Sequence, residues 1–174
     1  MKRHLFSSAL LFLLCFLPVP GHSANPDSAL GALRNLPPAY RNGVVWVSAD
    51  NADPNPDKWF VTARNSSRGG IMMNLTIADG SIISERPTIS PRAFLRQITP
   101  INIGAMRVNS TDLWRKASQF AQDQGSRLGS MSLQLQQHGR DSAPIWSVWY
   151  YDRSGRYLGF FSALATTGSI VSKH

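Results

Sequence analysis

The chain has 174 residues, of which 43% are hydrophobic and 16% are charged, and its formal net charge at pH 7 is +8. This length suits one domain with a hydrophobic core and leaves little room for a second. The single cysteine, Cys15, excludes a disulfide within the chain and a metal site built from several thiolates.

The first residues have the three-part layout of a secretory signal. A basic start is followed by an apolar run from Leu5 to Val19, and then by prolines and small residues. The run is too short to span a bilayer comfortably, and no second run follows. We therefore expect residues 1–23 to be removed, by cleavage after Ser23 or Ala24, and the protein to be periplasmic or secreted rather than integral to a membrane. Lipidation at Cys15 is an alternative, although the residues before it are bulky.

Loss of the signal leaves 16 basic and 10 acidic side chains, a net charge of +6, and thirteen of the basic residues are arginine. The planar guanidinium group pairs with carboxylates and phosphates and stacks on rings. This excess indicates either affinity for an acidic partner or an anionic envelope surface, or simply a solubilising charge spread over the surface.

The first half of the mature chain predicts a helix followed by three strands. Leu30, Leu33 and Leu36 share one side of a helix over Pro26–Leu36, which should stop at the prolines that follow. The predicted strands are Gly43–Ala49, Trp59–Ala63 and Ile71–Ala78, and the last two flank a polar hairpin loop, residues 65–70.

Two loops of this half have the composition of ligand sites. Asp50, Asp53, Asn55 and Asp57 have oxygen-ligand spacing, but the Gly and distal Glu of an EF-hand loop are missing, so a turn is the simpler interpretation. The backbone of residues 66–70 could bind an anion, yet hairpin loops commonly use the same residues.

Residues 86–109 are expected to be an ordered connector, because their isoleucines and other apolar side chains need burial. A short helix over Pro91–Gln97, capped by Ser90, is predicted within it.

The second half repeats the order of the first. A helix is predicted over Thr111–Gln124, with Ser110 or Thr111 as its cap and Gly125 at its end. The strand Ser130–Gln136 alternates apolar and polar residues, as a strand exposed to water on one side does. Trp146–Tyr151 and Tyr157–Leu164 flank a four-residue turn, 152–155, whose final Gly can adopt a left-handed conformation.

Comparison of the sequence with itself supports this symmetry. Trp59-Phe60-Val61 matches Trp146-Ser147-Val148, and Gly80-Ser81-Ile82-Ile83-Ser84 matches Gly168-Ser169-Ile170-Val171-Ser172. We therefore predict an α+β fold of two tandem helix-strand-strand-strand repeats, residues 24–85 and 110–174, which form antiparallel sheet with the helices on one face. Whether the repeats share one sheet is left open.

The pattern W-x-V-x-Y-Y-D-x-x-G-x-x-L-G, followed by A-T-T-G-S-I-V-S, resembles a PepSY-type repeat. Tandem copies in a small secreted chain also resemble the fold of the beta-lactamase inhibitor protein. The resemblance implies a noncatalytic extracytoplasmic module that binds or inhibits other proteins, often in connection with peptidases or the cell envelope.

Catalytic signatures are missing from the sequence. It has no G-x-S-x-G, H-E-x-x-H, paired C-x-x-C or phosphate-binding P-loop motif. His138, in a polar loop, is the one candidate for a placed general base, and it is the only support for a third hypothesis, a small hydrolase. We expect no catalytic activity, no cofactor and no metal site.

The aromatic stretch near the C-terminus provides the candidate site. Alternation places Trp149 and Tyr151 on the strand face opposite Trp146 and Tyr150, and only one face can pack under a helix. With Arg153 and Arg156 at the hairpin rim, Trp149 and Tyr151 would form the Trp/Tyr/Arg mixture that dominates protein-binding hot spots. The alternative is that this second face packs against the other repeat.

The leading hypothesis is therefore an extracytoplasmic protein partner, bound through Trp149, Tyr151, Arg153 and Arg156, with inhibition as one form of that binding. The alternative is an electrostatic binder of an anionic envelope glycan, a lipid headgroup or another polyanion, among which nucleic acid is the least expected.

Overall fold

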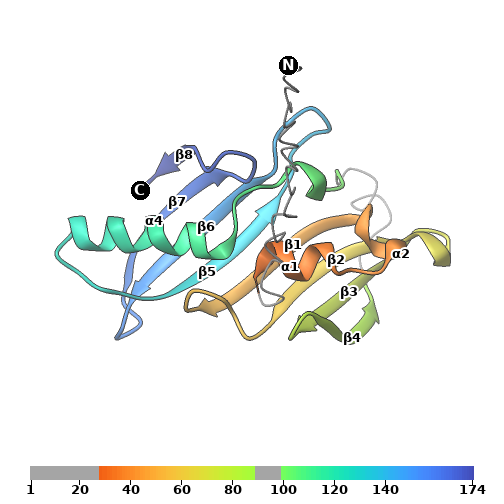
Figure 1. The fold of residues 1–174 in the computed structure, drawn as a ribbon, viewed down its shortest axis with the longest axis horizontal. Coiled ribbons are helices and arrows are strands. Elements are labelled where there is room, and N and C mark those ends of the chain that lie inside the picture. The colour runs from red at the N-terminus through yellow and green to blue at the C-terminus, as the bar shows by residue number, and fades with distance from the viewer. Residues whose placement is uncertain (1–27, 89–98) are drawn as a thin grey trace, which may run out of the picture.

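The computed structural model describes residues 28–88 and 99–174, which form an α+β fold with one antiparallel sheet of eight strands. The strand order is β4-β3-β2-β1-β5-β6-β7-β8, so the first and last four strands each form a meander and the two meanders join where β1 pairs with β5 (Figure 1). The predicted signal peptide and the predicted helix Pro91–Gln97 lie outside the described residues.

The elements of the first half are α1 (Ala29–Arg34), α2 (Pro38–Arg41), β1 (Val44–Ala52), β2 (Trp59–Asn65), the 3-10 helix η1 (Ser66–Arg68), β3 (Ile71–Ala78) and β4 (Ser81–Pro87). Those of the second half are the 3-10 helix η2 (Ile103–Ala105), α4 (Ser110–Asp123), β5 (Leu128–Gln136), β6 (Ile145–Asp152), β7 (Tyr157–Leu164) and β8 (Ile170–Lys173).

All six predicted strands are present, but the prediction of three strands in each half is wrong. The additional strands, β4 and β8, lie at the two edges of the sheet. Most of their side chains are exposed, so their sequences lack the alternation that marks a strand with one buried face.

The capping residues of the helices were predicted only in part from the sequence. Ser28 caps α1, and its Oγ accepts a hydrogen bond from Gly31 N at 3.1 Å. The cap of α4 is Asn109, not Ser110 or Thr111, and it forms a reciprocal capping box with Asp112. The one-turn helix α2 was not predicted, because the prolines at 37 and 38 were interpreted only as a stop although proline is well suited to a first helical turn.

One face of the sheet carries the hydrophobic core, and α1 and α4 both pack on it (Figure 1). Alternate residues of the central strands point toward these helices, among them Val47, Val61, Leu133 and Val148. The core is continuous between the two halves, because the buried rings of Trp59 and Trp146 lie 6.2 Å apart. The single sheet answers the question that the sequence left open.

The residues matched by self-comparison have similar surroundings in the two halves. Trp59 lies at the start of β2 and Trp146 near the start of β6, and both are buried. Gly80 and Gly168 precede the edge strands with positive φ angles of 70° and 76°, which glycine adopts without strain. Gly155 closes the turn between β6 and β7 with a φ of 80°, as expected.

Candidate functional site

The second face of the sheet, called here the open face, lies opposite α1 and α4. A row of paired residues crosses it over all eight strands, and seven of its eight members are uncharged and polar. In order from β4 to β8, the row is Ser84, Thr76, Phe60, Ser48, Gln134, Ser147, Ser162 and Ser172. The register is continuous, so the open face is one surface shared by both halves.

Aromatic side chains lie on both sides of this polar row on the open face. Trp149 and Phe160 pair across β6 and β7, with ring centroids 5.2 Å apart, and both are half-buried. Tyr151 contacts the exposed Tyr157 with centroids 6.0 Å apart. On β1 and β2, Trp46 is 37% exposed and Phe60 is 46% exposed. Phe60 and Trp149 are separated by β1 and β5, a distance of about 14 Å at the usual strand spacing.

The centre of the open face carries little charge. Two shorter rows flank the first: Trp46, Thr62, Asn74 and Arg86 on one side, and Ser132, Trp149 and Phe160 on the other. Arg86 is the only charged residue in the three rows, but Arg64 and Asp50, each two residues along a strand from Thr62 and Ser48, share this face. Most of the Arg and Lys residues in the described parts of the chain lie on helices and loops.

Asp152 organises the turn at one end of the aromatic hairpin. Its Oδ1 accepts hydrogen bonds from the Ser154 hydroxyl at 2.6 Å and from the backbone N–H groups of Ser154 and Arg156 at 2.9 and 3.0 Å. Its Oδ2 accepts from Arg156 Nε at 3.1 Å. These donors favour the ionised carboxylate, the Ser154 hydroxyl most, and lower the pKa of Asp152 to about 2.

The four predicted site residues fall into two groups. Trp149 and Tyr151 lie on the open face and do not pack between the two halves. Arg156 is tied to Asp152 at the turn, whereas Arg153 lines a separate pocket of about 360 Å³ with Trp114 of α4 and Asp53. The two arginines thus lie at the end of the sheet and do not form a common cluster with the rings.

The other loops considered from sequence have structural roles. Asn55 Oδ1 accepts a hydrogen bond from Ser110 Oγ at 2.7 Å, and no set of three metal-binding side chains is present in the described residues. Residues 66–68 form η1 within the β2–β3 hairpin, where Arg68 pairs with Glu85 at 3.1 Å. His138 is exposed in the loop after β5.

Sequence reasoning placed Trp46, Phe60 and Phe160 on strands but did not assign them to the site. Alternation gives each residue a face relative to its own strand, but it does not show which strands are neighbours. The pairing of β1 with β5, which brings the aromatic residues of both halves onto one surface, joins residues about 85 positions apart, such as Ser48 and Gln134.

No family model matches the chain, and a search of curated proteins found no match. A search of solved structures found the crystal structure of a "putative lipoprotein" from Clostridium difficile 630, with a TM-score of 0.47 and 8% sequence identity, over 78% of this chain and 82% of that one. Likeness at this level carries no function from one protein to the other. The described residues contain no helix long and apolar enough to cross a membrane.

Proposed function

We propose that this protein is a noncatalytic extracytoplasmic module that binds another protein through the open face of its sheet. The observation that carries the proposal is the arrangement of Trp46, Phe60, Trp149, Tyr151 and Phe160 on a continuous surface that no other part of the described structure covers. Exposed aromatic patches of this kind mark interaction sites in soluble proteins.

The size of the open face favours a protein over a small ligand. Eight strands at the usual spacing make it about 34 Å wide, and strands of about seven residues make it about 23 Å long. The resulting area of about 780 Å² is close to the ~800 Å² that each partner buries in a standard protein–protein interface.

The side chains of the open face are of the kinds found in protein–protein interfaces. The Trp149 and Phe160 pair would be the central anchor, with Tyr151 beside it, whereas Arg153 and Arg156 lie beyond the ends of the strands. The row of Ser, Thr and Gln residues supplies hydrogen-bond donors and acceptors between the rings. Inhibition of a peptidase, which the PepSY-like resemblance implies, is one activity that this binding would provide.

The scarcity of charge at the centre of the open face separates this proposal from electrostatic binding of a polyanion. Binding through rings and uncharged polar groups is expected to persist at high salt, because little of it depends on screened Coulomb attraction. Binding of an anionic glycan or nucleic acid would weaken steeply with added salt.

We also propose that the two halves are copies of one structural unit. Support comes from the shared strand order, from the buried Trp59 and Trp146 on β2 and β6, and from the left-handed glycines before β4 and β8.

The test is a change at the centre of the open face that leaves the core intact. Ser147 is half-buried on β6, in the middle of the polar row, and its replacement Ser147→Arg would place a long charged side chain there. With the mature protein as bait and the extracytoplasmic fraction of its own cell as the source, we expect one partner to be captured at low and high salt. We expect Ser147→Arg and Trp149→Ala to lose that partner.

Matched controls separate binding from folding. Gln119→Arg adds the same charge on the exposed side of α4 and should keep the partner. Trp149→Ala should cost about 2 kcal/mol of stability, because the half-buried side chain loses its ring pair and part of its apolar burial, whereas Trp146→Ala in the core should cost about 3–5 kcal/mol. Capture that disappears with salt, or that both open-face variants retain, would refute the proposal.

A further inference from the structure

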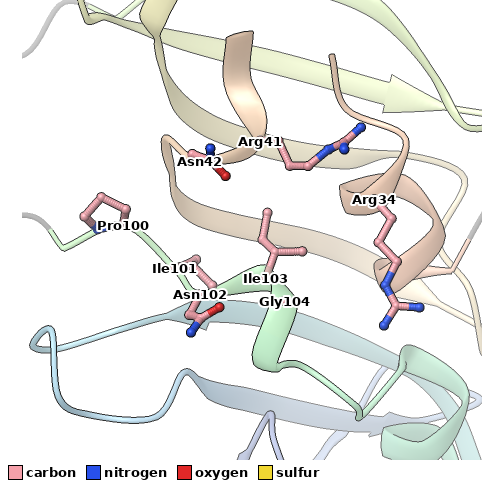
Figure 2. Close-up of a pocket in the computed structure, with 8 residues that line it drawn as sticks. All are labelled: Arg34, Arg41, Asn42, Pro100, Ile101, Asn102, Ile103 and Gly104. Atoms are coloured by element: carbon pink, nitrogen blue, oxygen red, sulfur yellow. The ribbon is translucent and has the colours of Figure 1, made fainter. Parts of the chain in front are cut away.

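A pocket of about 520 Å³ lies on another part of the molecule, between the two short helices and the segment that leads into η2. Figure 2 shows Arg34 of α1, Arg41 of α2 and Asn42 just after it on one side, with the two guanidinium groups pointing in different directions, and Pro100 to Gly104 on the other side. Ile101 and Ile103, which are 3% and 6% exposed, give the pocket an apolar floor. The pocket thus combines cationic walls with an apolar base.

The charged residues that line this pocket are both arginines. No Asp or Glu lines it, and none occurs in the two stretches that build it, residues 28–49 and 99–111. Those stretches contain three arginines, Arg34, Arg41 and Arg107. Arg107 donates hydrogen bonds to the carbonyl oxygens of Gly104 at 2.7 Å and Met106 at 2.8 Å, which holds a third cation next to the lining. The neighbouring loop after β5 carries one Arg and one Asp, so its net charge is zero and the net charge near the pocket stays positive.

Several hydrogen-bond donors that line the pocket remain available to a ligand. One guanidinium nitrogen of Arg41 donates to the carbonyl oxygen of Leu36 at 3.0 Å, which orients the group and leaves its other N–H groups. Arg34 and Arg41 form no ion pair with any described residue. Asn102 accepts a hydrogen bond from Ala105 N through Oδ1, so its amide NH₂ is left to donate.

We propose that this pocket binds a phosphate monoester carried on a small apolar body. A phosphate monoester has a charge of about −1.5 to −2 at pH 7, which matches two arginines, and its three oxygens accept several hydrogen bonds at once. The apolar floor is suited to the organic part of the molecule, which inorganic phosphate lacks. This site is independent of the open face and does not depend on its proposed function.

Monobutyl phosphate is a probe that contains both features. Calorimetry at constant ionic strength with the mature protein is expected to show binding that is tighter than that of inorganic phosphate or 1-butanol. Arg34→Gln should weaken it about tenfold or more, because a hydrogen bond to a charged group is lost. Arg41→Lys keeps the charge and loses the fork-like geometry, so it should weaken binding less.

Arg127→Gln is the matched control, since Arg127 is an exposed arginine far from the pocket lining and without an ion pair in the described structure. Equal affinities for wild type and Arg34→Gln, at unchanged melting temperature, would overturn the proposal, as would an absence of monobutyl phosphate binding.

Two sources of the ester can be distinguished with vesicles. Sedimentation with vesicles of phosphatidic acid and phosphatidylcholine, but not of phosphatidylcholine alone, together with loss in Arg34→Gln, would assign the phosphate to a lipid headgroup. Binding of monobutyl phosphate without vesicle binding would assign it to a soluble ester.

Discussion

At the scale of single residues, the same residue types serve different purposes on the two sides of one strand. On β6, Trp146 and Tyr150 are fully buried against the helices, whereas Trp149 and Tyr151 lie on the open face. The alternation of a strand is sufficient for this separation. Similarly, Arg156 stabilises a turn through Asp152, while Arg34 and Arg41 form no ion pair with the residues that the structure describes.

Asp152 gives a prediction at this scale that can be measured by pH titration. Its pKa in the folded protein is about 2, below the ordinary value of 3.8, so the folded state favours the charged form. The contribution of the carboxylate to stability is therefore complete above about pH 4 to 5 and is lost as the pH falls toward 2. An NMR titration of the carboxyl carbon should give a midpoint near 2.

Asp152→Asn removes that carboxylate, and it should lower the free energy of unfolding at pH 6 but have less effect at pH 2.5. A midpoint near 4, or a variant whose effect does not change with pH, would contradict the hydrogen-bond arrangement of the turn.

At the scale of elements, much of the fold could be predicted because a strand or helix that is buried on one side has a periodic pattern of apolar residues in its sequence. Ser130–Gln136 alternates along its length, and the structure places Met131, Leu133 and Leu135 in the core. The edge strands β4 and β8 lack this trace, because neither of their faces is well buried. The cap of α4 was misplaced by one residue, since Asn109, Ser110 and Thr111 are all common cap types and geometry decides among them.

The site could be predicted only in part, for a related reason. Trp149 and Tyr151 follow from alternation within one strand. The pocket around Arg34 and Arg41 combines residues 34–42 with residues 100–104, and no local pattern shows that these stretches meet.

The close approach of β5 to the β6–β7 turn provides a prediction at this scale. A Cβ added at Gly129 would lie 2.5 Å from Asp152 C and 2.6 Å from Arg153 Cα, which are backbone atoms that cannot move without shifting the turn. Gly129→Ala should therefore destabilise the fold by about 1–3 kcal/mol, as overpacking does. Chemical denaturation is the measurement.

Gly139→Ala is its control. The nearest atom to a new Cβ there is Ser142 Oγ at 3.7 Å, an ordinary contact, so the change should stay within about 0.5 kcal/mol. If the two variants were equally stable, the approach of β5 to the turn would be looser than described.

At the scale of the whole molecule, the pairing of β1 with β5 joins the two halves into one structure. It makes one core from two meanders, because Leu133 of β5 pairs with Ala49 of β1 and with Val148 of β6. It also makes one open face, because Ser48 and Gln134 pair in the same strands on the opposite side. A surface wide enough for a protein partner therefore exists only when both halves are folded together.

The final prediction is that the halves unfold as one unit. Leu133 is 2% exposed, so Leu133→Ala should cost about 2–5 kcal/mol. Because the core is shared, the loss should reduce hydrogen-exchange protection in β2 and β3 as much as in β6 and β7. Gln134→Ala, one residue along on the open face, should change protection little. If protection fell in β6 and β7 but not in β2 and β3, the two halves would fold separately. The open face would then consist of two smaller surfaces, each too narrow for a standard protein interface.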